Sequence, residues 1–135
     1  MNAARFLLDT NICIHIRRRP PAVLARFRQL KPGEAVLSVI TYGELAYGAE
    51  KSQFRERAHR QLAELAGLLP VLELPSRAGE FYGSIRAALA AEGGMIGNND
   101  LWIAAHAKAA GLVLVTNNER EFRRIDGLEI QNWAD

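Results

Sequence analysis

Four acidic residues stand where strands are expected to end or helices to begin. They are Asp9, Glu44, Asp100 and Glu121. The first follows the apolar run at 6–8, and the second lies one helical turn beyond the run at 35–40. The third opens an alanine-rich stretch, and the fourth lies one turn past the segment that follows the run at 112–115. Because functional groups gather beyond the carboxyl ends of parallel strands, these acids are expected to converge on one edge of a sheet.

Taken singly, each acid also has a purely structural interpretation. Asp9 precedes a helical stretch that its side chain could cap. Thr41 and Glu44 have the spacing of a capping box, in which the glutamate reaches back to the threonine amide. The third acid could favour its helix through the dipole, and the fourth stands three residues after Asn118 in another spacing of capping type.

The joint placement of the acids favours a metal site. Two carboxylates about 4 Å apart repel by roughly 4 kcal/mol at an effective dielectric near 20, so several of them require a cation or a proton. Mg²⁺, or alternatively Mn²⁺, suits them because these hard ions prefer oxygen ligands. His15, His59 and His106 are separated by more than forty positions each, which disfavours a zinc site.

Apolar runs and helical patterns alternate along the chain, which predicts an α/β fold with a parallel sheet and helices on both faces. We expect a single domain over residues 1–135, with three layers and about four to five strands. Gly111 is a typical residue to end the alanine-rich helix. Strands are expected at 6–8, 35–40, 71–74, 112–115 and 128–130, and helices at 22–30, 41–50, 54–69, 76–91, 100–110 and 119–124, after a first helix that ends before Pro20.

Arginine supplies 14 of the 17 basic residues, although the net charge is only +2. The planar fork of donors on arginine suits phosphate, so two clusters are candidate RNA contacts. They are Arg17, Arg18 and Arg19, and Arg120, Arg123 and Arg124. The apolar stretches are far shorter than the ~20 residues of a membrane span. The start leaves no room for a signal peptide, and Cys13, the single cysteine, suits a cytoplasmic protein.

Four segments, in order along nearly the whole chain, resemble the motifs of PIN-domain nucleases. They are 6–11 (FLLDTN), 41–45 (TYGEL), 96–107 (IGNNDLWIAAHA) and 115–122 (VTNNEREF). The last of them is similar in particular to the VapC toxins of bacterial toxin–antitoxin systems. The set is specific because four motifs share one order, whereas a lone L-D-T-N carries little weight.

This resemblance implies a PIN fold in which Asp9, Glu44 and Asp100 bind the metal ion. The implied reaction is Mg²⁺-dependent hydrolysis of RNA by an activated water, which leaves a 5′-phosphate and a 3′-hydroxyl. Many PIN domains carry an aspartate where this chain has Asn118, and Glu121 is expected to supply the missing carboxylate. The residues expected to support the acids are Thr10, Asn11, Thr116 and Asn118.

The resemblance also implies partners. A cognate antitoxin, VapB, is expected to wrap the toxin with a helical segment, to push an arginine toward the acids and to bind promoter DNA for the complex. Dimerisation of the toxin is expected as well. Candidate apolar contacts for the antitoxin are Phe54, Leu62, Phe81, Tyr82 and Trp102. The fourth motif resembles that of toxins that cut initiator tRNA in the anticodon stem-loop, which by analogy favours a tRNA substrate.

Other interpretations remain open at this point. A PIN-like module that binds RNA or a partner without cutting is supported by the amide at Asn118, and cleavage that EDTA stops would argue against it. A phosphatase of the acid-phosphatase type needs a second aspartate two residues after the first, where this chain has Asn11. A receiver domain needs a lysine after the late strand, and 116–118 has none.

Overall fold

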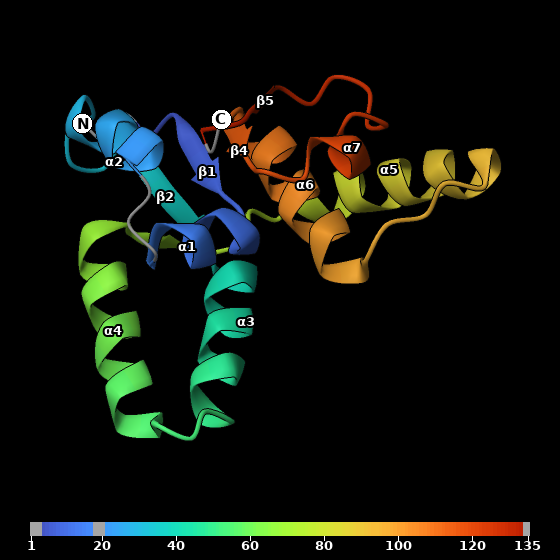
Figure 1. Ribbon diagram of the computed structural model, residues 1–135. Helices are drawn as coiled ribbons and strands as arrows, with labels where there is room; N and C mark the ends of the chain where they lie inside the picture. Colours follow the sequence, from blue (N-terminus) through green and yellow to red (C-terminus); the bar gives the residue numbers. More distant parts are fainter. Residues whose placement is uncertain (1–3, 18–20, 134–135) are drawn as a thin grey trace.

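The computed structural model describes residues 4–17 and 21–133 (Figure 1). They form a five-stranded sheet in the order β3-β2-β1-β4-β5, with every neighbouring pair parallel. The strands are β1 (Phe6–Leu8), β2 (Ala35–Ser38), β3 (Val71–Leu72), β4 (Val113–Val115) and β5 (Ile130–Gln131). The helices are α1 (Thr10–Arg17), α2 (Pro21–Arg28), α3 (Val39–Glu50), α4 (Arg55–Leu68), α5 (Ala78–Glu92), α6 (Asn98–Ala110) and α7 (Glu119–Phe122). The predicted parallel α/β fold is confirmed.

Helices cover both faces of the sheet, as predicted. Successive side chains of a strand point to opposite faces, so Leu7 belongs to one buried cluster and Phe6 and Leu8 to another. The first cluster packs against α5, α6 and α7, and the second against α1 to α4. Cys13 is buried in the second cluster, consistent with a packing role. Within the described residues, no helix is long and apolar enough to cross a membrane.

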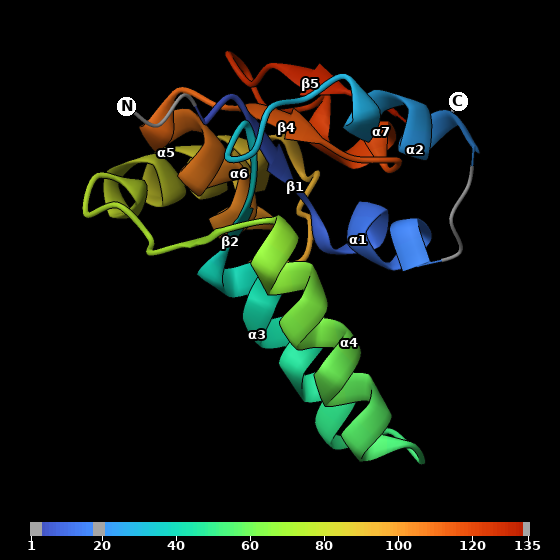
Figure 2. The same ribbon diagram turned by 90° about the vertical axis from the view of Figure 1, so that its left-hand side faces the viewer.

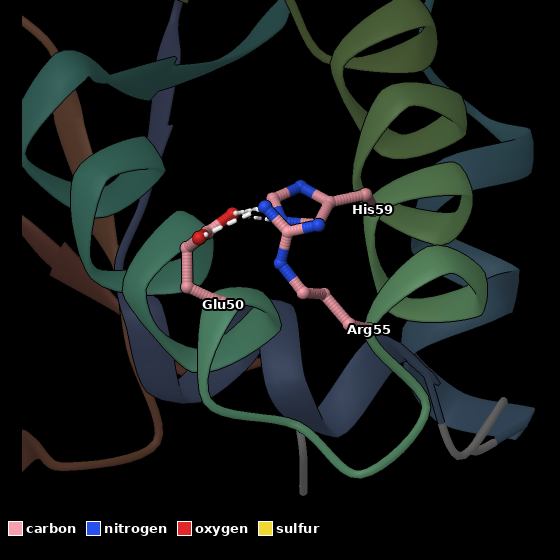
Figure 3. Close-up of polar contacts among 3 residues, drawn as sticks. All are labelled: Glu50, Arg55 and His59. Carbon is pink, nitrogen blue, oxygen red and sulfur yellow. Dashed lines mark hydrogen bonds and ion pairs between the residues drawn. The ribbon is translucent and has the colours of Figure 1, made fainter.

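Helices α3 and α4 form a hairpin that projects away from the sheet (Figures 1 and 2). Its tip is closed by Glu50, whose carboxylate accepts from Arg55 Nη2 at 2.8 Å and contacts His59 Nε2 at 2.6 Å (Figure 3). These side chains are exposed, so solvent screens their contacts and the contacts contribute little to stability. His59 therefore contacts the tip of the hairpin through Glu50.

The start of α3 differs from the prediction. Strand β2 ends at Ser38, which caps the helix by accepting from the Ile40 amide at 3.2 Å. Thr41 consequently lies inside the helix and is buried, so the capping box with Glu44 is wrong. Apolar β-branched residues at 39 and 40 read as strand by propensity, but the serine cap decides where the helix begins. The last strand, β5, likewise begins at Ile130 instead of two residues earlier.

The end of the described chain closes the core beside β1. Trp133 is only 2% exposed, and its ring meets Phe6 edge-on at 5.2 Å and Phe27 at 5.7 Å between centroids. Its indole Nε1 donates to the side chain of Gln131 at 3.0 Å. The polar end of this large side chain is therefore satisfied while its rings fill the space between α2 and the sheet.

Candidate active site

Asp9 and Thr116 meet because they follow neighbouring strands. Leu8 of β1 pairs with Val115 of β4, so the next residue of each strand emerges at the same edge of the sheet. The Thr116 hydroxyl donates to Asp9 Oδ2, and the Ile12 amide donates to Asp9 Oδ1 at 2.8 Å. Asp9 is 2% exposed. It therefore caps α1, as the structural interpretation predicted, while also standing at the sheet edge where the functional interpretation needs it.

The hydroxyl of Thr116 is oriented by the loop that follows it. It accepts from the backbone amide of Asn118 at 2.9 Å, which directs its own hydrogen toward Asp9. Thr116 thus holds the first acid by a hydrogen bond and is completely buried, and its role in catalysis stays a prediction. Asn118 takes part through its main chain, and its side chain does not cap α7.

Glu44 is tied to the first acid through the neighbouring threonine. Thr10, the first residue of α1, donates its hydroxyl to Glu44 Oε1 at 2.6 Å. This bond fixes the second acid across 34 positions of sequence, and the expected support of the first acid by Thr10 stays a prediction. Asn11 is exposed on α1, and its predicted role stays a prediction.

Asp100 and Glu121 complete the group. Asp100 lies in the first turn of α6, and Glu121 of α7 forms a hydrogen bond with it. Burial raises the pKa of Asp100 to about 6, helped by the negative charges of Glu121, Asp9 and Glu44 and by that hydrogen bond. Burial also raises the pKa of Asp9, against the hydrogen bonds from Thr116 and Ile12, and the charge of Glu44 adds to the rise. The negative charges of the four predicted acids therefore interact with one another.

The donor set fits a hard divalent cation. Carboxylates with raised pKa values mark an excess of negative charge that a cation would offset, and all the donors are oxygen atoms. Across residues 4–17 and 21–133, no three His, Cys, Asp or Glu side chains are close enough to hold an ion as they stand.

The excess charge predicts how the metal-free protein responds to pH. The pKa of Asp100 is about 6 in the folded chain against an ordinary value of 3.8, so the folded state binds this proton more tightly. Its contribution to the free energy of unfolding therefore falls as pH rises from about 4 to about 6. Asp100→Asn should gain about 1 kcal/mol on the wild type across that range, after allowance for solvent screening.

Urea unfolding in EDTA at several pH values measures this difference. Asp126→Asn, an exposed aspartate away from the acids, should keep the wild-type dependence on pH. If the free energy of unfolding depended on pH in the same way for Asp100→Asn and the wild type, the pKa of Asp100 would not be raised by burial and by the neighbouring acids.

The first turn of α6 is held against α5 by a set of polar and aromatic contacts. The Tyr82 hydroxyl donates to Asn98 Oδ1 and accepts from Arg86 Nη1 at 2.8 Å. The rings of Tyr82 and Trp102 stack at 4.0 Å between centroids. These contacts brace the turn that carries Asp100. No local pattern along the chain predicts them, because α5 and α6 meet only in the tertiary fold.

A buried hydrogen bond joins the two helices that carry Glu44 and Asp100. His106 of α6 lies 2.9 Å through Nδ1 from the hydroxyl of Ser38, the residue that caps α3. Burial lowers the pKa of His106, so the ring is neutral, and one hydrogen joins Nδ1 and the serine oxygen. Among the described residues, His106 Nε2 and the hydroxyl of Thr41 are buried without a hydrogen-bond partner.

Removing the serine hydroxyl tests this link. Ser38→Ala takes away the cap of α3 and leaves His106 Nδ1 buried without its hydrogen-bond partner. The free energy of unfolding should fall by about 1–2 kcal/mol, measured by urea unfolding. Ser84→Ala, on the exposed side of α5, is the control and should change little. Equal stability of the two variants would argue that the link contributes nothing.

The predicted arginine contacts are only partly described. Arg18 and Arg19 and the side chain of Arg17 lie outside the described residues. Arg123 is paired with Glu119 at 3.2 Å, and Arg124 donates to the carbonyl of Gly94 at 3.0 Å. Arg120 is exposed on α7. A contact of these arginines with RNA stays a prediction.

Fold and acids together define a PIN-type domain, and comparison with protein families agrees, since the PIN domain model matches residues 6–128. The chain is 44% identical over 131 residues to Ribonuclease VapC2 of Haemophilus influenzae, and equally to the tRNA(fMet)-specific endonuclease VapC of Shigella flexneri. Each match covers 96% of this chain and 98% of the relative.

Solved structures give the same answer. The VapBC complex of Salmonella typhimurium bound to DNA matches with a TM-score of 0.91 and 42% identity, covering 96% of this chain and 98% of that one. VapBC-1 of nontypeable Haemophilus influenzae matches with a TM-score of 0.90 and 41% identity over the same shares. The chain belongs to the PIN-domain family and, within it, to the VapC ribonucleases. Ribonucleases of the PIN family are metal-dependent, and the phosphatase and receiver interpretations are excluded.

Proposed function

We propose that this ribonuclease cuts initiator tRNA in its anticodon stem-loop, with Mg²⁺ held by Asp9, Glu44, Asp100 and Glu121. The observation that carries the metal site is the raised pKa of Asp100, to which the other three acids all contribute. The substrate rests on similarity, because the relatives from Shigella flexneri and Salmonella typhimurium are named tRNA(fMet)-specific endonucleases. A tRNA substrate also implies action in the cytoplasm.

Each acid has a task in this proposal. Asp9 is held rigidly by two donors and presents a fixed carboxylate, while Thr10 holds Glu44 beside it. Asp100 and Glu121 share a hydrogen bond that a cation would replace. A divalent cation bound by these oxygens supplies Lewis-acid activation of water and stabilises the charge that develops on the phosphate. Hydrolysis by water leaves a 5′-phosphate and a 3′-hydroxyl.

Incubation of the purified protein with total cellular RNA tests the proposal. New 5′-phosphate ends are expected in the anticodon stem-loop of initiator tRNA, with Mg²⁺ or Mn²⁺ present and none in EDTA. If mRNA or rRNA were cut while tRNA stayed intact, the protein would still be a ribonuclease, but initiator tRNA would be ruled out as its substrate. RNA binding without cleavage under any metal would instead favour the module that no longer cuts.

Glu121 is proposed as the fourth acid in place of Asn118. Support comes from its hydrogen bond to Asp100 and from its charge, which contributes more than that of Asp9 or Glu44 to the raised pKa of Asp100. Glu121→Gln should lower cleavage by about 10²-fold and raise the Mg²⁺ concentration needed for half-maximal rate. Asn118→Ala, whose main-chain bond to Thr116 is unaffected, should lose less. A larger loss of cleavage in Asn118→Ala than in Glu121→Gln would assign the fourth metal ligand to Asn118.

A VapB antitoxin is the proposed partner, because the matching structures from Salmonella typhimurium and Haemophilus influenzae are VapBC complexes. The described surface offers an apolar groove of about 500 Å³ between α1, α2 and α4, lined by Ile16, Phe27 and Leu68 among others. Of the apolar contacts expected from the sequence, Leu62 is buried in the core and is not available, whereas Phe54 is 66% exposed. Promoter DNA would be bound by the complex through the antitoxin, and a toxin homodimer within it remains a proposal.

A further inference from the structure

The buried hydrogen bond between His106 and Ser38 lies at the same distance along two helices from two of the acids. On α6, His106 stands six positions after Asp100, and Ser38 stands six positions before Glu44 at the start of α3. At about 1.5 Å per residue, each acid is about 9 Å along its helix from the bond. Because short helices are rigid elements, a shift of the two helices at the bond is passed on to both acids.

His106 is a polar residue in an apolar part of the core. It is completely buried, and the other buried residues of α6 are leucine, isoleucine and alanine. Its Nδ1 is bonded to Ser38, whereas its Nε2 has no hydrogen-bond partner within the described parts of the chain. Buried polar atoms cost stability unless they are bonded, so an apolar side chain of similar size would suit this position at least as well. What histidine adds is the directional bond to Ser38.

This bond differs from the other contacts that hold the acids. Thr10 holds Glu44 from α1, and Tyr82 holds the first turn of α6 from α5. Each of these contacts ties one acid-bearing helix to a third element. The bond between His106 and Ser38 instead ties α6 to the start of α3, and these two helices are also in contact with each other.

We propose that His106 is a positioning residue for the ribonuclease reaction, and that its bond to Ser38 sets the separation of the Glu44 and Asp100 carboxylates. Metal ligands must be held within about 0.5 Å of the productive geometry, and a misplacement of about 1 Å can cost about 10²-fold in rate. The inference rests on the proposed metal site at these acids, and it does not depend on which RNA is cut.

His106→Leu tests the proposal, because it removes both ring nitrogens and keeps an apolar side chain of similar size. The free energy of unfolding in EDTA should stay level or rise. In cleavage of whichever cellular RNA the wild type cuts, kcat should fall about 10- to 100-fold with KM little changed. Binding of Mn²⁺ to the protein without RNA, followed by electron paramagnetic resonance of the free ion, should weaken about tenfold.

A conservative variant separates positioning from packing. His106→Asn keeps a polar group that can bond to Ser38, but it leaves space where the ring was. It should therefore be less stable than His106→Leu and nevertheless have the higher kcat and the tighter binding of Mn²⁺. A residue that only filled the core would give the same order of the two variants in stability and in activity.

Ser38→Ala breaks the same bond from the other side and should lower kcat to a similar extent, so it provides the test if His106→Leu does not fold. The double variant should lose no more than the larger single loss, because both substitutions act through one bond. Additive losses in kcat would contradict this account.

Ile85→Val is the control, in the same core cluster but on α5. It should lower the urea midpoint and leave kcat and Mn²⁺ binding unchanged. Wild-type kcat and Mn²⁺ binding in both His106→Leu and Ser38→Ala would overturn the positioning role while the metal site stands. A wild-type protein that binds no Mn²⁺ would overturn the metal site and the positioning role together.

Discussion

Replacement of Asp100 by asparagine is expected to abolish RNA cleavage, with a loss of roughly 10³-fold or more. The substitution keeps the shape of the side chain and removes one charge from the four acids. Metal ions supply several kcal/mol to reactions of this kind, and each ~1.4 kcal/mol lost costs a factor of ten in rate. The rate constant for cleavage of whichever cellular RNA the wild type cuts, at saturating Mg²⁺, measures the loss.

The same variant should fold at least as well as the wild type in EDTA, because one source of repulsion has gone. This opposite effect on activity and stability separates a functional acid from a structural one. Asp126→Asn is the control and should cut normally. Full activity of Asp100→Asn would remove this residue from the active site, and a loss of activity together with a loss of stability would indicate a structural role.

Truncation of Trp133 to alanine is expected to produce the largest loss of stability, about 3–5 kcal/mol. Trp133 is buried between Phe6 and Phe27, and the cavity left by its rings cannot be filled by α2 without moving the helix. The loss is a large part of the ~5–15 kcal/mol that a domain has in total. Urea unfolding followed by far-ultraviolet circular dichroism measures it.

The effect should reach the active site. Gln131 lies two residues before Trp133, and its backbone carbonyl accepts a hydrogen bond from the amide of Thr116 at 3.0 Å. This segment therefore helps to hold the threonine that orients Asp9. Trp133→Phe keeps an aromatic ring and should lose less than half as much stability. An unchanged unfolding midpoint for Trp133→Ala would mean that the C-terminal segment is not part of the core.

Local patterns in the sequence determined the order of the elements and the candidate acids. Gly111 ends α6 with a positive φ of 67°, as its position after an alanine-rich run predicts. Asp9 caps α1 through the Ile12 amide because both lie within one turn. Such features need contacts only between residues a few positions apart, and the alternation of strands and helices then brings the acids to one edge.

Only the tertiary structure decided which groups hold these acids in place. The partner of Glu44 is Thr10 and not Thr41, and Asp9 receives its second donor from Thr116, 107 positions away. The bond between Ser38 and His106 spans 68 positions. Propensity and periodicity describe neighbours along the chain, whereas these bonds depend on which strands pair and how helices pack. The sequence therefore predicts which acids form the site, and the packing of strands and helices determines how their charges are gathered and oriented.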